Sequence, residues 1–270
     1  MGAKEPRDAK LRAVSQKPAT RLYVAADLAA GARIALGAAE AHRLRDVLRL
    51  KPGDVIALFN GRDGEFAGRL AELDRDGGSA LAEECLRPQR GSADLWLVFA
   101  LVKRPRLEWL VEKATEIGAS ALVPVTTQRT VTERINVGRL EAIAREAAEQ
   151  SERLDLPEIR AVIPLPALIA AWPAERRLIL CDETGTAPPI AARAAELPPG
   201  PLACLIGPEG GFAESELDAL RKLPFVFPAG LGPRVLRSET AALGALSVLQ
   251  AFAGDWSAAR SRVGPADASL

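Results

Sequence analysis

Two glycine-rich segments near the C-terminus carry residue types from which a small-molecule site can be built. Residues 207–212 read GPEGGF, and residues 230–237 read GLGPRVLR. Three glycines within five positions let the first segment turn sharply and let its backbone approach a ligand, because no Cβ intervenes. The second segment places Arg234 and Arg237 directly before a strongly apolar stretch. Backbone-rich loops beside two cations predict a small-molecule site.

The common phosphate-binding motifs do not match these segments. No lysine follows Gly211, as a P-loop requires, and the pair Gly230 and Gly232 lacks the third glycine of the dinucleotide fingerprint. The alternative interpretation is that both segments are only tight turns between a strand and a helix.

The elements that position these segments alternate between strands and helices, which is typical of an α/β domain with a largely parallel sheet. Ligands in such sheets lie at the carboxyl ends of the strands, so residues 182–185 (DETG), which also follow a strand, are expected to meet the two segments. Residues 241–252 are apolar nearly all round and predict a buried helix, with Ser238 as its N-cap. The expected strands are 95–102, 121–125, 159–163, 177–181, 202–206 and 225–227, and the other helices are 107–117, 137–153, 165–172 and 189–197.

The N-terminal third is predicted to form a small β-barrel, because short strand candidates separated by turn residues recur along it. One helix, 38–48, interrupts the strands, and a polar break at 88–92 predicts a domain boundary. The expected strands are 21–24, 33–36, 55–59, 65–73 and 80–86. The expected domains are a disordered basic tail at 1–20, the barrel at 21–90, the α/β domain at 91–256 and a tail at 257–270.

Composition excludes several classes of function. The chain has 35 Lys and Arg residues and 35 Asp and Glu residues, so any RNA contact must come from local basic patches. One histidine and three cysteines, with no C-x-x-C pair, argue against zinc, and no metal is expected. Sparse cysteines suit a reducing cytoplasm, and no apolar run approaches the roughly 18 residues of a membrane span.

The stretches IGPEGGF and LGPRVLRSETA, which begin at Ile206 and Leu231, together resemble the RsmE-type family of the SPOUT methyltransferases. Members of that family methylate N3 of a uridine in small-subunit (16S) ribosomal RNA. Further matches are Arg21, residues 42–54, residues 103–118, in which Pro105 departs from the family pattern, and EAAEQSER at 146–153. The resemblance therefore covers residues 21 to about 252.

The resemblance implies a fold, a cofactor and partners. The fold is a SPOUT-type α/β domain with a C-terminal trefoil knot and a mostly parallel sheet, preceded by a PUA-like β-barrel that engages RNA. The cofactor is S-adenosylmethionine. The partners are 16S ribosomal RNA or the small ribosomal subunit, and a second copy of the chain, with the apolar helix 241–252 at the dimer interface.

Methyl transfer to uridine N3 needs a cofactor pocket, a place for the base and an exit for the N3 proton. Arg237 is the first candidate for the cation that stabilises the uridine anion. Glu209 and Glu239 either assist departure of the proton or hold an arginine in place, and Glu239 also suits the first turn of a helix by charge alone. The candidates for cofactor binding, mostly through backbone groups, are Leu180, Ile206, Gly207, Gly210, Gly211, Leu231, Gly232, Val235 and Leu236.

The candidates for RNA binding are mainly basic residues, because arginine pairs with phosphate and stacks on bases. The alternative for those in the helix 38–48 is an ordinary solvated face, and most helix charges at 141–149 are expected to be solvated pairs. The RNA-binding candidates are Arg21, His42, Arg45, Arg49, Lys103, Arg104, Arg106, Gln150 and Arg153.

Three other functions remain alternatives. A non-catalytic RNA-binding assembly factor would keep the fold, but the intact glycine and arginine segments count against it. A SPOUT enzyme acting on another RNA position is disfavoured by the barrel and by the EAAEQSER stretch. A metabolic α/β enzyme would leave the basic barrel helix unexplained.

Overall fold

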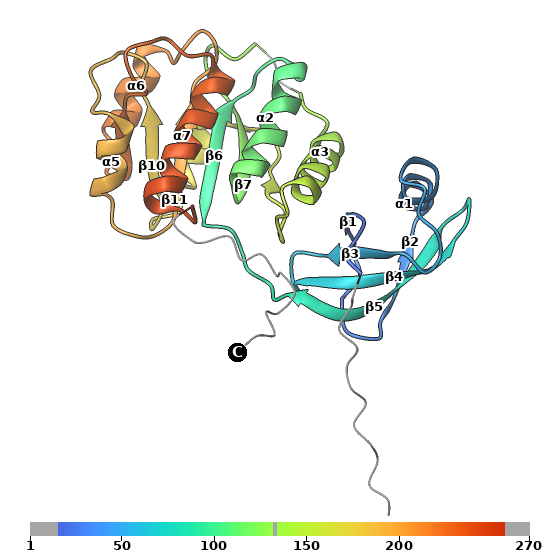
Figure 1. Cartoon of the computed structure of the whole chain (residues 1–270). Helices are drawn as coiled ribbons and strands as arrows, with labels where there is room; N and C mark the ends of the chain where they lie inside the picture. The colour runs from blue at the N-terminus through green and yellow to red at the C-terminus, as the bar shows by residue number, and fades with distance from the viewer. Residues whose placement is uncertain (1–15, 132–133, 257–270) are drawn as a thin grey trace, which may run out of the picture. The chain divides into compact units, whose positions relative to one another are not determined.

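The computed structural model describes residues 16–131 and 134–256, and the chain forms two compact units, Met1–Gln89 and Arg90–Leu270 (Figure 1). The tail expected at 257–270 and most of the tail expected at 1–20 lie outside the described residues. No helix of the described ranges is long and apolar enough to cross a membrane.

The first unit is a five-stranded sheet in the order β1-β3-β4-β5-β2. Strand β1 pairs with β3 in parallel, and the other neighbours are antiparallel. Backbone hydrogen bonds from Ala19 and to Thr20 extend the pairing with β3 beyond β1. The sheet wraps a core that includes Leu22, Ile56 and Leu58. The strands are β1 (Arg21–Tyr23), β2 (Arg33–Leu36), β3 (Val55–Phe59), β4 (Glu65–Leu73) and β5 (Gly78–Arg87), which confirms the predicted strand positions.

The helix predicted at 38–48 changes its winding halfway along. An α-helical start, α1 (Ala38–His42), continues as a π-helical turn, η1 (Arg43–Val47). Arg49 follows with φ of +57°, a left-handed conformation that is uncommon outside glycine. Single π-turns are rare and recur at functional sites. The turn leaves Val47 and Leu48 exposed.

The second unit is a parallel sheet of seven strands in the order β12-β10-β11-β6-β7-β8, with β9 also paired to β7. The predicted parallel α/β architecture is confirmed. The single strand expected at 159–163 is instead two short strands. The strands are β6 (Leu95–Ala100), β7 (Ala121–Thr126), β8 (Glu158–Ile159), β9 (Ile163–Pro164), β10 (Arg177–Cys181), β11 (Leu202–Ile206) and β12 (Val226–Ala229).

Helices cover both faces of this sheet. Alternate residues of β6 point to opposite faces: Leu97 packs into the core beneath α2, α3, α5 and α7, and Val98 packs into the core beneath α4 and α6. Burial on both faces explains why the strands read as continuous apolar runs. The helices are α2 (Arg104–Ile117), α3 (Val137–Gln150), α4 (Leu165–Ala170), α5 (Ile190–Glu196), α6 (Glu214–Arg221) and α7 (Ser238–Ala253).

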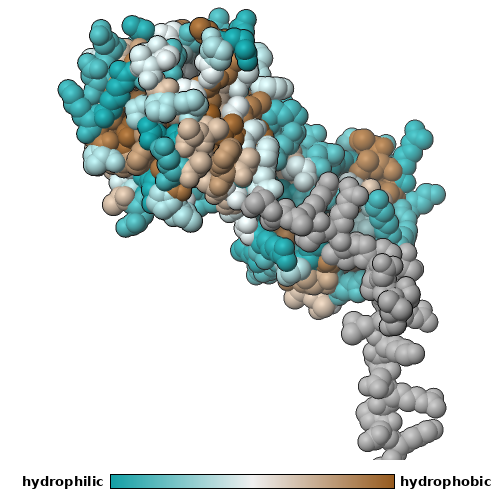
Figure 2. Space-filling model, turned by 60° about the vertical axis from the view of Figure 1, so that its left-hand side comes forward, coloured by the Kyte–Doolittle hydropathy of each residue, from teal (hydrophilic) through white to brown (hydrophobic). Residues whose placement is uncertain are grey.

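Helix α7 departs from two expectations. Arg237 occupies the N-cap position without a side-chain cap, and the hydroxyl of Ser238 donates instead to the Gly207 carbonyl at 2.9 Å. The helix is also buried on one side only, because Leu243 and Val248 are half-buried and Phe252 is 56% exposed. Figure 2 shows apolar surface interrupting the hydrophilic surface of the second unit.

The C-terminal part of α7 closes the end of α2. Gly118, with φ of +108°, ends α2, whose last carbonyls lack helical partners. The fully buried Gln250 amide donates to the carbonyls of Ile117 and Gly118 at 3.1 and 3.0 Å. One side chain of α7 therefore caps a helix from a distant part of the sequence.

We predict that Gln250→Leu lowers the free energy of unfolding by about 2 kcal/mol, because the Gly118 carbonyl stays buried without a donor and the Ile117 carbonyl keeps only Trp256 Nε1, at 3.3 Å. Urea denaturation measures the loss. Gln150→Ala, at the exposed end of α3, is the matched control and should change stability by less than about 0.5 kcal/mol. Equal effects of the two variants would contradict the capping role.

Candidate active site

Four neighbouring parallel strands of the second unit end at one edge of the sheet. These strands are β12, β10, β11 and β6 in spatial order. Their carboxyl ends carry the segments 230–237, 182–189, 207–213 and 101–103 respectively. The predicted meeting of the two glycine-rich segments with residues 182–185 therefore has a geometric basis, since parallel strands place these loops together.

The segment 207–212 is tightly packed and held by its neighbours. Gly211 has φ of +68°, and a Cβ there would run into the Glu183 carboxylate. A Cβ on Gly207 would lie 2.9 Å from the ring of the buried Phe212. The Phe212 amide donates to Glu183 at 3.1 Å, and Arg129 donates to the Gly210 carbonyl at 2.8 Å. Glycine therefore suits positions 207 and 211, where a Cβ would crowd the Phe212 ring and the Glu183 carboxylate.

The segment 230–237 is fixed at its start and open at its end. The Gly230 amide donates to the Pro188 carbonyl at 2.8 Å, and the Gly230 carbonyl accepts from Ile190 at 3.0 Å. Gly232 has φ of +97° with open space around it. Val235 is 96% exposed, and Arg237 is also exposed. Within 16–131 and 134–256, no carboxylate forms an ion pair with Arg237, so its guanidinium group is available to a ligand.

Arg106, from the first turn of α2, lies between the two glutamates predicted for proton removal. Its Nη1 donates to Glu209 Oε1 at 3.3 Å, and its Nε lies 3.6 Å from Glu239 Oε1. Glu209 is on the segment 207–212 and Glu239 is in the first turn of α7. Both glutamates therefore pair with one arginine, Arg106, and their roles in catalysis stay predictions.

Asp182 anchors the loop after β10. Its side chain is 1% exposed, accepts from the Thr184 amide at 2.8 Å and pairs with Arg221 of α6 at 2.5 Å. Burial acts to raise the pKa of Asp182, but the hydrogen bonds from Thr184 and Arg221 outweigh it and hold the pKa below its ordinary value. The carboxylate is therefore ionised at neutral pH and serves the fold of the loop.

The nine cofactor candidates all lie at this edge of the sheet. Leu180 and Ile206 are buried at the ends of β10 and β11, so they offer backbone groups only. The others lie on the segments 207–212 and 230–237. The described residues contain no group of His, Cys, Asp and Glu side chains suited to a metal ion. Cys181 and Cys204 are buried nearby, and burial raises the pKa of Cys204 to about 12, so this thiol is inert.

The RNA candidates of the second unit divide into exposed and structural residues. Lys103 and Arg104 are exposed at the start of α2. Arg153 is only 8% exposed and donates to Asp155 and to the Thr115 carbonyl, both at 2.8 Å. Prediction of RNA contact at Arg153 is therefore corrected, because its guanidinium group is buried in the fold.

Gln150 lies in a different setting, a groove of about 400 Å³ between α2 and α3. Four glutamates line the groove together with the exposed Trp109. Arg139 lines the groove as well, and Glu108 pairs with it at 3.3 Å, so RNA contact at Gln150 stays a prediction. The glutamates are Glu108, Glu112, Glu116 and Glu146.

In the first unit, Arg21 is also structural. Its side chain is 12% exposed, pairs with Glu65 at 2.6 Å and lies over the ring of Phe59 at 4.4 Å. Glu65 is shared with Arg87 at 2.7 Å. The RNA contact predicted at Arg21 is corrected for the same reason as that at Arg153.

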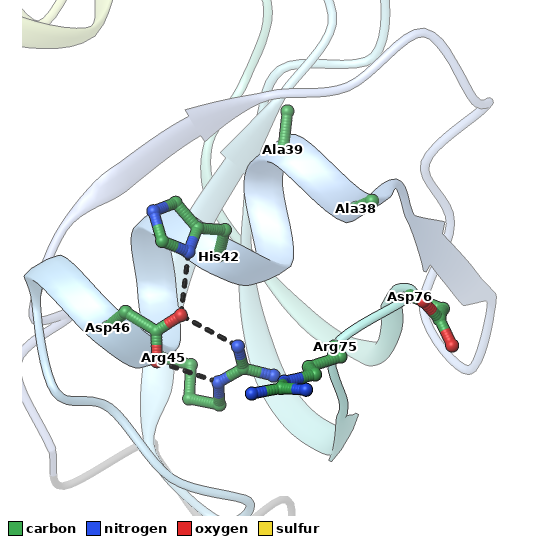
Figure 3. A pocket seen from close by; sticks show the side chains of 7 residues that line it. All are labelled: Ala38, Ala39, His42, Arg45, Asp46, Arg75 and Asp76. Carbon is green, nitrogen blue, oxygen red and sulfur yellow. Dashed lines mark hydrogen bonds and ion pairs between the residues drawn. The ribbon is translucent and has the colours of Figure 1, made fainter.

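His42 and Arg45 meet in an open pocket of the first unit (Figure 3). Asp46 lies between them, 2.6 Å from His42 Nδ1 and bound by Arg45 through Nε and Nη2 at 2.9 and 2.7 Å. The hydrogen bond from Arg45 is the main reason that the pKa of Asp46 falls to about 2. Arg75 and Asp76, on the hairpin between β4 and β5, line the same pocket.

Sequence reasoning missed Arg75, because only the fold of the hairpin brings it beside the helix. Figure 3 shows that Arg45, from the helix, and Arg75, from the hairpin, line the same pocket. Arg49 is not among the residues that line this pocket. The pocket thus presents two cations, of which Asp46 orients one.

Comparisons with known proteins match both units. A model of the RNA methyltransferase domain matches residues 89–250, and a model of the RNA methyltransferase PUA domain matches residues 36–80. The chain is 30% identical to the ribosomal RNA small subunit methyltransferase E of Rickettsia conorii over 230 residues, 84% of this chain and 93% of the relative. It is 32% identical to that of Bacillus subtilis over 222 residues, 78% of this chain and 86% of the relative.

Solved structures give the same result. A putative methyltransferase from Legionella pneumophila, in complex with its cofactor SAM, has a TM-score of 0.79 and 30% identity, and the match covers 87% of this chain and 98% of that one. A ribosomal RNA small subunit methyltransferase E from Neisseria gonorrhoeae, bound to S-adenosyl methionine, has a TM-score of 0.77 and 26% identity, with 88% and 99% covered. The SPOUT-type fold with an N-terminal PUA domain, expected from the sequence, is confirmed.

We predict that Asp182→Asn lowers the free energy of unfolding by about 2 kcal/mol at pH 7, because Arg221 loses its charged partner. The folded-state pKa of Asp182 is depressed, so its stabilisation is present above the ordinary value of 3.8 and is lost as pH falls through the lower folded value. Urea denaturation from pH 7 to about pH 3 should therefore show the deficit shrinking. The control is Asp218→Asn, because Asp218 is 59% exposed and lies 4.0 Å from Arg221. An equal loss of unfolding free energy in this variant would contradict the role of Asp182 as the anchor of the loop.

Proposed function

The chain belongs to the RNA methyltransferase family, and from this membership we propose that it transfers a methyl group from S-adenosylmethionine to N3 of a uridine in 16S ribosomal RNA. The observation that carries the proposal is the convergence of two glycine-rich loops and an exposed Arg237 at the carboxyl edge of the sheet. The match of the first unit to an RNA methyltransferase PUA domain supports RNA as the substrate.

The loops have the properties that S-adenosylmethionine binding requires. Gly207 and Gly211 stand where a Cβ would collide, so backbone amides and carbonyls face the site without side-chain bulk. When bound, the cofactor would supply an electrophilic methyl group on a sulfonium. Leu180, Ile206 and the segments 207–212 and 230–236 would hold it, chiefly through backbone groups.

The side chains around these loops have separate roles in the proposal. Arg237 stabilises the negative charge that develops on the uridine as N3 loses its proton, and a preorganised cation is most effective in a site that excludes water. Glu209 and Glu239 are the acidic candidates for assisting that proton. Positioning supplies a further share of the acceleration.

RNA recognition is assigned to both units. His42, Arg45 and Arg49 of the first unit, together with Lys103 and Arg104 of the second, are the proposed contacts. Arginine binds phosphate bidentately and stacks on unpaired bases, which is how proteins read RNA loops. The pocket around Asp46 supports this assignment, since two arginines, Arg45 and Arg75, line it.

The proposal also covers assembly, topology and location. We place the protein in the cytoplasm as a homodimer with a C-terminal trefoil knot, in line with the family it belongs to. The outer face of α7 supports a dimer interface, because Leu243 and Val248 are half-buried and Phe252 is exposed there.

The function is tested with small ribosomal subunits from cells that lack this protein. We expect labelled methyl from S-adenosylmethionine to enter 16S ribosomal RNA, and mass spectrometry to identify the product as 3-methyluridine. Another methylated nucleoside would indicate a different RNA target. Cofactor binding without any transfer would instead support a non-catalytic assembly factor.

We predict that Arg237→Ala lowers kcat by about 100-fold or more, the usual cost of removing one preorganised stabiliser of developing charge. Cofactor affinity, measured by calorimetry, should change by less than about 3-fold, because backbone groups hold the cofactor. Arg234→Ala removes the same charge from the same loop and should lower the rate far less. A loss of cofactor affinity in Arg237→Ala would move this residue into the cofactor pocket.

A further inference from the structure

Arg106 joins two loops that come from different strands. Its side chain is 35% exposed and lies between the Glu209 and Glu239 carboxylates, at 3.3 and 3.6 Å. Glu209 follows β11, and Glu239 follows β12. A guanidinium group presents several N–H donors in one rigid plane, so a single arginine can orient two acids at once.

Glu239 has one carboxylate oxygen that this arrangement leaves free. Its side chain is 12% exposed, and Oε1 faces Arg106. Oε2 is buried, and no group of the described residues donates a hydrogen bond to it. A buried carboxylate oxygen without a donor is costly, and such an atom in a site points to a donor that arrives with a ligand.

We propose that Arg106 is a positioning residue that holds Glu239 so that Oε2 accepts the N3 proton of the uridine. The inference rests on the proposed function. As the bond from N3 to the methyl carbon forms, the N3–H bond breaks and its proton passes to Glu239 Oε2. The methyl–sulfur bond breaks, and its electron pair stays on sulfur, which becomes neutral. Glu239 then releases the proton to water.

This role differs from the direct RNA contact predicted for Arg106 from the sequence. Two carboxylates neutralise its charge, so it attracts phosphate weakly. Arg104, two residues earlier, is 80% exposed and pairs with Glu108 on its own helix. Arg104 therefore has the character of an RNA contact, and it is a matched control for loss of one arginine at the start of α2.

The position of Glu239 also restricts its motion. The preceding residue, Ser238, is bonded to the Gly207 carbonyl at 2.9 Å. The Glu239 backbone is thereby tied to the glycine-rich loop proposed to hold the cofactor, while Arg106 fixes its side chain. The acceptor oxygen and the methyl donor would then be set relative to each other before the base enters.

The test compares Arg106→Ala, Arg106→Lys, Glu239→Gln and Arg104→Ala in methyl transfer to small subunits. We expect Arg106→Ala and Glu239→Gln each to lower kcat by about 100-fold, with KM for the subunit changed by less than about 3-fold. The double variant should be no slower than the slower single one, since both act through the same oxygen. Arg106→Lys should recover part of kcat, because lysine keeps the positive charge but lacks the planar set of N–H donors with which arginine orients two carboxylates.

Two measurements separate this role from the alternatives without relying on activity. Arg104→Ala should weaken RNA binding and reduce its salt slope, the slope of the logarithm of the binding constant against the logarithm of the salt concentration, by about 1. Arg106→Ala should leave this slope unchanged. S-adenosylhomocysteine affinity, from calorimetry, should be unchanged in Arg106→Ala and Glu239→Gln. A salt slope reduced in Arg106→Ala, with kcat retained, would overturn the proposal in favour of RNA contact.

Weaker S-adenosylhomocysteine binding in Glu239→Gln, with kcat retained at saturation, would also overturn it, because Oε2 would then face the cofactor. The proposed function itself is tested by wild-type transfer. If the wild type transfers no methyl group, a double-mutant cycle on thermal unfolding still measures coupling between Arg106 and Glu239. A coupling free energy between Arg106 and Glu239 would support the contact by which Arg106 positions Glu239. The absence of coupling would overturn that contact.

Discussion

The backbone of the segment 207–212 is the constraint on which the site depends. Glycine is required there, because a Cβ at Gly207 or Gly211 would collide with neighbouring side chains. Other segments hold this glycine-rich loop in place: Glu183, Arg129, Ser238 and Arg106 each reach it from a different loop or helix. These contacts are possible because four parallel strands end at the same edge of the sheet. Rigidity at the site is thus a property of the sheet and not of the loop.

Much of this architecture could be predicted from the sequence. Continuous apolar runs placed β3, β10 and β11 correctly, because strands buried on both faces have no competing period. Helical periodicity could not reveal the π-turn at Arg43–Val47, since one extra residue in a short helix leaves little trace in the pattern. Periodicity also could not show whether the Ser238 hydroxyl caps helix α7 or bonds to the Gly207 carbonyl, because Gly207 lies far away in the sequence.

The candidate site shows the same division. The sequence identified the loops and their charged residues, but it assigned Arg21, Arg106 and Arg153 to RNA because a positive charge is all that a sequence displays. In the fold each of these arginines pairs with a carboxylate, which belongs to a distant segment for Arg21 and Arg106 and to Asp155 of the same turn for Arg153. Zero net charge anticipated this in general terms, since most cations then have an acid to neutralise them. The sequence could not foresee that Arg75, on a hairpin, lines the same pocket as Arg45.

Helix α7 begins at the glycine-rich loop and ends against α2. There Gln250 donates hydrogen bonds to Ile117 and Gly118, which precede it in the chain by 133 and 132 residues. Contacts of such long sequence separation form late, because closure of the chain must precede them. During synthesis, α2 emerges long before α7, the helix that caps it. The site therefore cannot exist on a partly made chain. Helix α7 is thus the last of the described elements to be made among those that the site requires.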